Sequence, residues 1–118
     1  MIAWPSDVRA FVATGATDMR KGMNGLALQI QEGLKRDPHA GDVFIFRGRR
    51  GDLVKIVWHD GLGLSLYAKR LEQGAFQWPK ITDGVMRMTA VQLAALVAGM
   101  EWTRVVSPRR TQTPKEVS

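Results

Sequence analysis

Runs of apolar residues alternate with short, glycine-rich polar segments along the chain, and their spacing predicts a mixture of strands and helices. Residues 8–13 (VRAFVA) form a β-rich run that ends at a Thr-Gly turn signal, so they predict a first strand. Residues 43–46 (VFIF) are apolar at every position, as is typical of a strand covered on both faces. Three further runs follow glycine-containing turns: residues 53–59, 64–70 and 75–78. Because these turns are short, we expect an antiparallel meander.

Two segments show the three-to-four-residue spacing of apolar side chains that is typical of helices. In the first, Gly22 and Gly25 disfavour an early start, and Asn24 is the expected N-cap. Its stripe consists of Met23, Leu26, Ala27, Ile30 and Leu34, and Asp37-Pro38 ends it. The second begins at residues 89–92 (TAVQ), which match the capping-box pattern, and its apolar face consists of Leu93, Leu96, Val97 and Met100.

The hairpin over residues 53–70 has a predicted register if Asp60 pairs with Leu64 and the loop ends at Gly63. This register places Val54, Ile56 and Trp58 beside Arg70, Ala68 and Leu66, with His59 opposite Ser65 and Lys55 opposite Lys69. Like charges that face each other in a sheet are destabilising. Either an anionic partner offsets the two lysines, or water solvates both long side chains.

These elements predict one α+β domain over residues 1–106: an antiparallel β-meander of about five strands packed with two or more α-helices. A length of 118 residues fits one ordinary domain. Residues 107–118 contain two prolines, polar residues and an excess of positive charge, so we expect a basic flexible tail there.

The composition excludes several classes of chemistry. The absence of cysteine rules out disulfides, thiolate metal sites and a cysteine nucleophile. No Walker, nucleophile-elbow or dinucleotide motif is present, acids are scattered singly, and the two histidines lack motif partners. We therefore expect no catalytic residue, no metal, no cofactor and no enzymatic activity. No apolar stretch approaches about 20 residues and residues 1–7 lack a signal-peptide pattern, so we expect a cytoplasmic protein without a membrane partner.

The net charge of +6, with arginine outnumbering lysine, indicates an anionic partner, nucleic acid first, because a guanidinium can grip a phosphate with two parallel hydrogen bonds. The same excess of charge can simply keep a small domain soluble. Two clusters stand out: the turn within residues 46–52 (FRGRRGD), and Arg20-Lys21 between the first strand and the first helix. In the competing interpretation all are solvated, Arg47 pairs with Asp52, and Asp18 caps locally.

Aromatic rings among basic residues can stack on unpaired bases. Trp58 is expected in the core, whereas Tyr67 alternates with Ser65 and Lys69 and is expected to be exposed. The candidate nucleic-acid-binding residues are Arg20, Lys21, Arg47, Arg49, Arg50, Lys55, Tyr67, Lys69 and Arg70.

Residues 43–79 (VFIFRGRRGDLVKIVWHDGLGLSLYAKRLEQGAFQWP) and 14–26 (TGATDMRKGMNGL) closely resemble a family of bacterial mobile-element proteins. These are the accessory proteins encoded by the second open reading frame of insertion-sequence family sixty-six, often labelled TnpB, a label shared with an unrelated RNA-guided nuclease. The resemblance covers roughly residues 8–100. It implies a role in transposition beside a separate transposase that carries the catalytic acids. Seven candidates match the family pattern as motif members without a known role: Arg20, Lys21, Arg47, Arg49, Arg50, Lys69 and Arg70.

The expected function is therefore that of a transposition accessory protein that binds nucleic acid, element-end DNA first, through a basic hairpin face. Nothing in the sequence resembles a recognition helix, so we expect weak sequence preference. The alternative is an adaptor that contacts the transposase, other element-encoded proteins or a second copy of itself as a homo-oligomer. Its expected surface is an apolar face of Phe44, Phe46, Leu53 and Val57. A metal-dependent nuclease is a third, disfavoured hypothesis.

Overall fold

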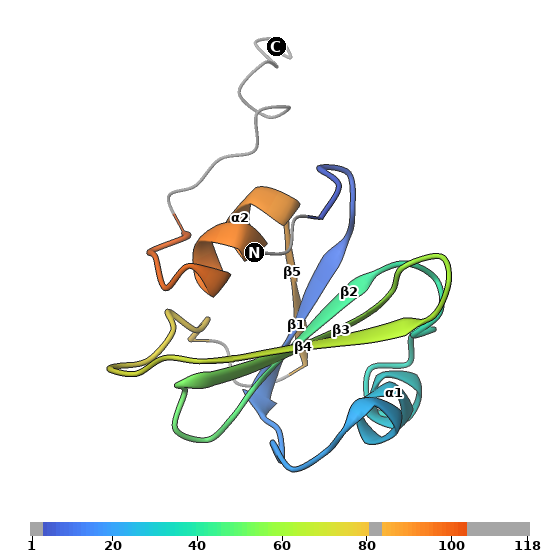
Figure 1. Cartoon of the computed structure of the whole chain (residues 1–118), viewed down its shortest axis with the longest axis horizontal. Helices are drawn as coiled ribbons and strands as arrows, with labels where there is room; N and C mark the ends of the chain where they lie inside the picture. Colours follow the sequence, from blue (N-terminus) through green and yellow to red (C-terminus); the bar gives the residue numbers. More distant parts are fainter. Residues whose placement is uncertain (1–3, 81–83, 104–118) are drawn as a thin grey trace, which may run out of the picture.

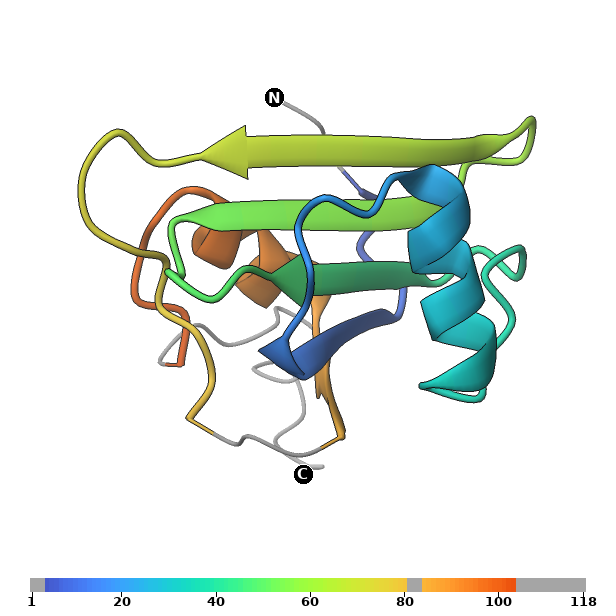
Figure 2. The ribbon, with the colours of Figure 1, turned by 90° about the horizontal axis from the view of Figure 1, so that it is seen from below.

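The computed structural model describes residues 4–80 and 84–103, which form a five-stranded sheet with one helix on each face (Figures 1 and 2). The order of strands across the sheet is β4-β3-β2-β1-β5. The strands are β1 (Ala10–Ala16), β2 (Val43–Arg47), β3 (Leu53–His59), β4 (Leu64–Arg70) and β5 (Val85–Met88), and the helices are α1 (Met23–Glu32) and α2 (Ala90–Val97). The architecture is the expected α+β class with a mostly antiparallel sheet.

The sheet differs from a simple meander because β1 and β2 run parallel. Helix α1 forms the crossover between them, while β2, β3 and β4 form the expected antiparallel meander. Since β4 also runs in the direction of β2, the carboxyl ends of β1, β2 and β4 all lie at one end of the sheet, which we call the carboxyl end. The loops that follow these strands are therefore neighbours.

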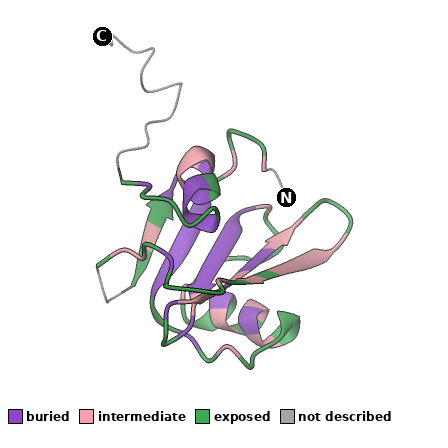
Figure 3. Cartoon of the chain, turned by 60° about the vertical axis from the view of Figure 1, so that its left-hand side comes forward, coloured by how far each residue is buried: buried purple, intermediate pink, exposed green. Residues whose placement is uncertain are grey.

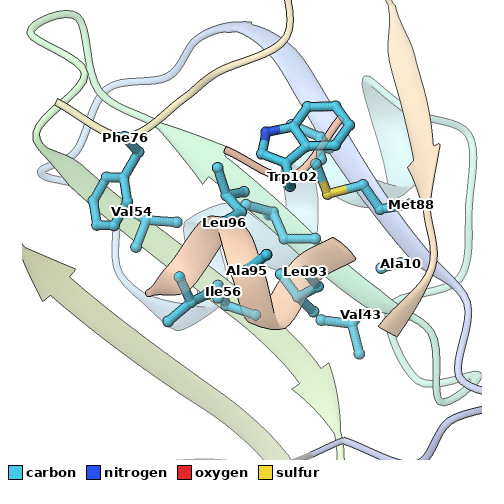
Figure 4. Close-up of a cluster of buried hydrophobic side chains, with 13 residues drawn as sticks. Ala10, Val43, Val54, Ile56, Phe76, Met88, Leu93, Ala95, Leu96 and Trp102 are labelled. Carbon is cyan, nitrogen blue, oxygen red and sulfur yellow. The ribbon is translucent and has the colours of Figure 1, made fainter. Parts of the chain in front are cut away.

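Side chains alternate between two cores. On one face, Val43, Ile45, Val54 and Ile56 pack with Leu93 and Leu96 of α2, and Trp102 lies near Met88 (Figure 4). On the other face, Phe44, Phe46 and Val57 pack with Leu26 and Ile30 of α1. All four residues from Val43 to Phe46 have no exposed surface, as the unbroken apolar run predicts. Figure 3 shows that burial is concentrated in the central strands, whereas the outer part of the β3–β4 hairpin is only half-buried.

Residues 75–78 do not form the expected strand. Instead, the backbone N–H of Phe76 donates to Gly51 O at 2.9 Å, and Trp78 Nε1 donates to the same carbonyl at 2.9 Å. The segment thus packs across the β2–β3 turn. Its buried Phe76 and half-buried Trp78 alternate with exposed residues, a pattern that also fits a strand. The fifth strand is β5, which pairs antiparallel with β1 and has only four residues, too few for a periodicity signal.

The expected β3–β4 register is wrong by one residue. Trp58 pairs with Ser65, and Lys55 pairs with Ala68 instead of Lys69. The turn explains the shift: the Asp60 N–H donates to Gly63 O at 3.0 Å, which leaves a two-residue loop. Its first residue is Gly61 with φ +96°, a conformation that this loop type requires and glycine supplies.

The start of α2 agrees with the sequence prediction, whereas the start of α1 does not. Helix α2 has the full capping box, in which Gln92 N donates to Thr89 Oγ1 at 3.1 Å and Thr89 N donates to Gln92 Oε1 at 3.0 Å. Met100 lies beyond the end of α2 and is exposed. Helix α1 is capped by Gly22 without a side-chain hydrogen bond, so the prediction of Asn24 as the N-cap is wrong. The expected tail over residues 107–118 lies outside the described residues.

Candidate nucleic-acid interface

The basic turn between β2 and β3 is held in place by the rest of the protein. Gly51 N donates to Gly48 O and Gly48 N donates to Leu53 O, both at 3.2 Å, which closes the turn. A Cβ on Gly48 would lie 2.7 Å from Met19 Cγ, and Gly51 has φ +80° and lies against Trp78. These glycines therefore admit the protein's own side chains, whereas Arg49 and Arg50 between them are exposed.

The third arginine of the turn motif has a different environment. The Arg47 guanidinium lies 5.6 Å from the centre of the Trp78 ring, a cation–π contact, and Arg47 Nε donates to Gly48 O at 3.4 Å. Asp52 does not pair with Arg47 as the competing interpretation expects, because its carboxylate lies 3.6 Å from Arg70 Nη1. Arg47 thus supports the turn from the α2 side of the sheet.

The loop after β1 reaches the same region because β1 and β2 are parallel. Thr17 N donates to Arg47 O at 2.8 Å, which places the Asp18–Lys21 loop beside the basic turn. The Arg20 side chain and backbone N–H both donate to the Asp18 carboxylate, with a shortest distance of 2.8 Å from Arg20 Nη2. These contacts hold the pKa of Asp18 far below its ordinary value and raise the pKa of Arg20. The Arg20 side chain nevertheless keeps 91% of its surface exposed.

Two lysines lie next to this loop. Lys55 Nζ donates to Lys21 O at 2.9 Å, and Lys21 Nζ donates to Gln29 Oε1 of α1 at 3.0 Å. Both ammonium groups are on the α1 side of the sheet. They extend the positive region from the loop towards α1.

An open hollow of about 710 Å³ lies at the carboxyl end of the sheet, between the Asp18–Lys21 loop and the basic turn. It is lined by residues from three separate segments: Ala16, Thr17, Asp18, Met19, Arg20, Gly48, Arg49, Arg50, Asp52, Leu53 and Arg70. We call this hollow the arginine groove. Its four arginines outnumber its two aspartates, and each aspartate already pairs with one arginine. Arg49 and Arg50 add positive charge that neither aspartate offsets in these pairs.

The groove contains four of the nine candidate residues: Arg20, Arg49, Arg50 and Arg70. Lys21 and Lys55 lie beside it. Lys69, Tyr67 and Arg47 are on the α2 side of the sheet, since they pair with or alternate with residues of the α2 core. Lys69 Nζ donates to Val97 O at the end of α2 at 2.8 Å, so the expected single face of Lys55 and Lys69 does not exist.

Tyr67 was expected to be an exposed ring, but it is half-buried and packs against the α2 core. The one-residue change of register does not alter which of its neighbours share its face. The wrong expectation comes from treating that face as solvated, when α2 and the 75–78 segment cover it. Trp58, expected in the core, is half-buried and contacts Trp4 with ring centroids 5.6 Å apart.

Asp18, Met19 and Asp52 belong to the groove but were not candidates. Asp18 and Asp52 partner groove arginines, and Met19 fills the space that Gly48 leaves open. The proximity of Asp18 to the motif Arg20 was visible in the sequence. The pairing of Asp52 with Arg70 depends on the hairpin register, which sequence reasoning missed by one position.

Two further findings concern the described part of the chain. Among residues 4–80 and 84–103, no group of three or more His, Asp or Glu side chains is arranged to hold a metal ion. Within the same ranges, no helix combines the length and the apolar character that crossing a membrane requires.

Comparisons with known proteins place the chain in a family. It matches the family model for the IS66 Orf2-like protein over residues 8–107. Two similar proteins come from Sinorhizobium fredii: uncharacterized protein y4hO is 43% identical over 117 residues, covering 99% of each chain. Uncharacterized protein y4jC is 42% identical over 105 residues, covering 89% of this chain and 90% of its own. No solved structure matches the chain significantly. The matched range contains the groove and every described strand and helix. The chain therefore belongs to the IS66 Orf2-like proteins, a family of transposition accessory proteins.

Proposed function

We propose that this accessory protein binds nucleic acid during transposition, with element-end DNA as its ligand and the arginine groove as its contact surface. The observation that carries the proposal is the convergence of Arg20, Arg49, Arg50 and Arg70 from three distant parts of the sequence onto one open hollow. Planar guanidinium groups suit phosphate oxygens because they donate two parallel hydrogen bonds. An open hollow also admits a polymer that continues past it in both directions.

The groove supports contacts to the phosphate backbone more than reading of bases. Its lining comes from the loop after β1, the β2–β3 turn and the adjoining ends of strands, and neither helix lines it. Sequence-specific readers of the major groove usually present a helix or a two-stranded ribbon to base edges. We therefore propose weak sequence preference, with the choice of element ends made by the transposase.

We also propose that the accessory protein leaves strand cleavage to the transposase and acts in the cytoplasm, where the bacterial element resides. A cleavage assay on element-end DNA with Mg²⁺ or Mn²⁺ is expected to give no product. Clean products from the purified protein alone would overturn this part of the proposal.

The adaptor alternative loses the surface that the sequence predicted for it. Phe44, Phe46 and Val57 have no exposed surface because α1 covers them, and Leu53 is half-buried in the floor of the groove. These four residues therefore do not form an exposed apolar docking face. A role in protein binding needs a different surface.

The test is an anisotropy titration of a labelled duplex that carries the element's terminal repeat, repeated at several salt concentrations. Each neutralised phosphate contributes a slope of about −0.9 to log affinity against log salt. If Arg49 and Arg50 each contact one phosphate, the double variant Arg49→Ala/Arg50→Ala is expected to flatten the slope by about 1.8. A random duplex of equal length is expected to bind almost as well.

The matched control is Lys80→Ala/Arg87→Ala, which removes the same charge from two exposed residues outside the groove. This control is expected to keep the wild-type slope. Equal losses in both double variants would mean that only net charge matters. Absence of salt-dependent binding by the wild-type chain, with and without transposase, would end the proposal.

A further inference from the structure

Strand β4 forms one edge of the sheet (Figure 2). The backbone groups of alternate residues in an edge strand point away from the sheet. The hydrogen bonds from Asp60 N to Gly63 O and from Leu71 N to Asp52 O fix the alternation of the β3–β4 ladder. In that alternation Ser65, Tyr67 and Lys69 bond to β3. The N–H and C=O groups that face outward therefore belong to four residues: Leu64, Leu66, Ala68 and Arg70.

This edge lacks most of the devices that usually prevent strand addition. It is seven residues long, contains no proline, and shows no bulge against β3. Among the described residues no backbone or side-chain hydrogen bond reaches its outward groups. Its only charged residues, Lys69 and Arg70, are both at its carboxyl end. Such an edge is a template for another strand.

We propose that β4 pairs antiparallel with β4 of a second copy of this chain, about a two-fold axis at Tyr67. The bonding alternation admits this register, because it pairs outward-facing Leu66 with outward-facing Ala68 of the other copy and Leu64 with Arg70. All seven residues of each strand are then paired. A two-fold pairing is also the commonest way in which identical chains associate.

The charges along β4 favour this antiparallel arrangement. A parallel pairing would bring Lys69 and Arg70 of both copies together, which is destabilising. In the antiparallel register each Lys69 lies opposite Ser65 of the other copy. The Ser65 hydroxyl donates to Asp60 Oδ2 at 3.0 Å, so the basic end of one strand meets the end of its partner that carries a carboxylate.

The central part of the strand carries no charged side chain, so pairing it with a second strand buries no charge there. Leu66 and Ala68 occupy the α1 side of the sheet and Tyr67 occupies the α2 side. Leu66 and Tyr67 keep part of their surface exposed, and Ala68 is exposed. Pairing would cover these surfaces on both faces and bring the two Tyr67 rings together across the axis.

The resulting ten-stranded sheet has a geometric consequence. An axis perpendicular to the sheet keeps both copies of α1 on one face, so both arginine grooves open on the same side. With about 3.4 Å per residue, the two Arg70 positions lie roughly 20 Å apart along the strand direction. The pairing itself does not depend on the proposed binding of nucleic acid.

The first test measures the mass of the full-length chain by sedimentation over a wide range of concentrations, without nucleic acid and at salt high enough to screen the +6 charge. A concentration-dependent rise to twice the single-chain mass is expected. Ala68→Pro removes one outward N–H from an accessible residue and leaves the ladder to β3 intact, so this variant is expected to stay monomeric with an unchanged circular dichroism spectrum.

The second test uses the natural absence of cysteine. Tyr67 faces itself as a non-hydrogen-bonded pair, where Cα atoms lie about 4.5 Å apart, within disulfide range. Tyr67→Cys is therefore expected to cross-link to itself on oxidation. Ser65→Cys alone is expected not to cross-link, but a mixture of Ser65→Cys and Lys69→Cys is expected to do so.

A wild-type chain that stays monomeric at every concentration, or a dimer whose cysteine variants do not cross-link in this pattern, would overturn the proposal. A monomer whose capture by transposase is weakened in Ala68→Pro would also overturn it, and would assign the edge to the transposase. Loss of salt-dependent DNA binding with intact self-association would instead contradict only the proposed function.

Discussion

Asp18 offsets part of the positive charge of the arginine groove, because its carboxylate binds the exposed Arg20 side chain, which lowers the pKa of Asp18. A phosphate that approaches Arg20 must compete with this ion pair. Asp18→Asn is expected to tighten DNA binding about two- to fivefold at low salt, since exposed ion pairs are individually weak. The gain is expected to fade as salt rises.

Asp37→Asn is the matched control for this measurement. Like Asp18, Asp37 accepts a hydrogen bond from a backbone N–H two residues later, that of His39 at 2.9 Å, but it does not line the groove. The control is expected to leave the affinity almost unchanged. An equal gain in both variants would mean that net charge, and not the release of Arg20, governs binding.

Gly51 is a position at which the turn depends on both a positive φ and the absence of a side chain. It has φ +80°, and a Cβ would lie 3.3 Å from Ala75 Cβ and 3.4 Å from Trp78 Cδ1. Gly61 has φ +96° but no atom within 4 Å of its Cβ position. Gly51→Ala is expected to lower the free energy of unfolding by about 2 kcal/mol, and Gly61→Ala by about 1 kcal/mol.

Urea unfolding of both variants measures this difference. Equal losses would show that backbone strain alone matters at Gly51 and that the 75–78 segment yields easily. A larger loss at Gly51 would confirm that this segment holds the basic turn in place.

At this scale, the sequence identified the groove arginines as charged residues and showed Asp18 close to Arg20, but it did not reveal the partner of Arg70. Arg20, Arg49 and Arg50 belong to conspicuous clusters. The partner of Arg70 depends on a register that differs by one residue from the expected one, and the partner of Lys69 is a carbonyl at the end of α2. Contacts between distant segments leave no local signal.

Among the elements, the β3–β4 turn shows how one side chain sets a register. Asp60 accepts hydrogen bonds from the backbone N–H groups of Gly63 and Leu62, and from the Ser65 hydroxyl, and these lower its pKa below the ordinary value of 3.8. The ionised carboxylate is therefore the form that stabilises the fold. Its contribution is complete above pH 3.8 and disappears as the pH falls through the lowered pKa.

Asp60→Ala is accordingly expected to be less stable than the wild type near neutral pH, with a difference that shrinks progressively below pH 3.8. Urea midpoints of both proteins across the acid range measure this difference. A constant difference at all pH values would indicate that the hydrogen bonds act independently of the charge.

Elements with strong local signals were predicted accurately. The boundaries of β3 and β4 and the capping box of α2 agree with the sequence patterns, because alternation, glycine turns and capping chemistry are all local. The prediction placed the fifth strand at residues 75–78, because Phe76 and Trp78 alternate with smaller or polar residues as in a strand, although this segment packs across the β2–β3 turn. The true fifth strand, β5, has only four residues, which carry almost no pattern.

For the whole molecule, the parallel pairing of β1 with β2 determines where function can reside. An antiparallel pairing would place the Arg20 loop at the opposite end of the sheet from the Arg49-Arg50 turn. The expected meander therefore could not have brought the two clusters together, although the family and the fold class were both correct. Strand direction follows from the crossover helix, and only the path of the chain in space reveals it.

Charge reversal in the groove separates the two functions considered for the whole protein. Arg49→Glu/Arg50→Glu is expected to abolish DNA binding, since two attractive groups become repulsive, and to spare capture by the transposase in a pull-down. Retained DNA binding with loss of capture would favour the adaptor. Both residues are exposed, so the fold is expected to tolerate the change.

The order of strands also has a consequence for synthesis. Chains emerge with their first residues leading, and the α1 core is complete once β4 has emerged, because it requires only residues up to that strand. The α2 core needs Leu93, Leu96 and Trp102, which the ribosome releases much later. A nascent chain that stalls before these residues presents one finished face and one bare apolar face, which makes it a natural substrate for chaperones and proteases.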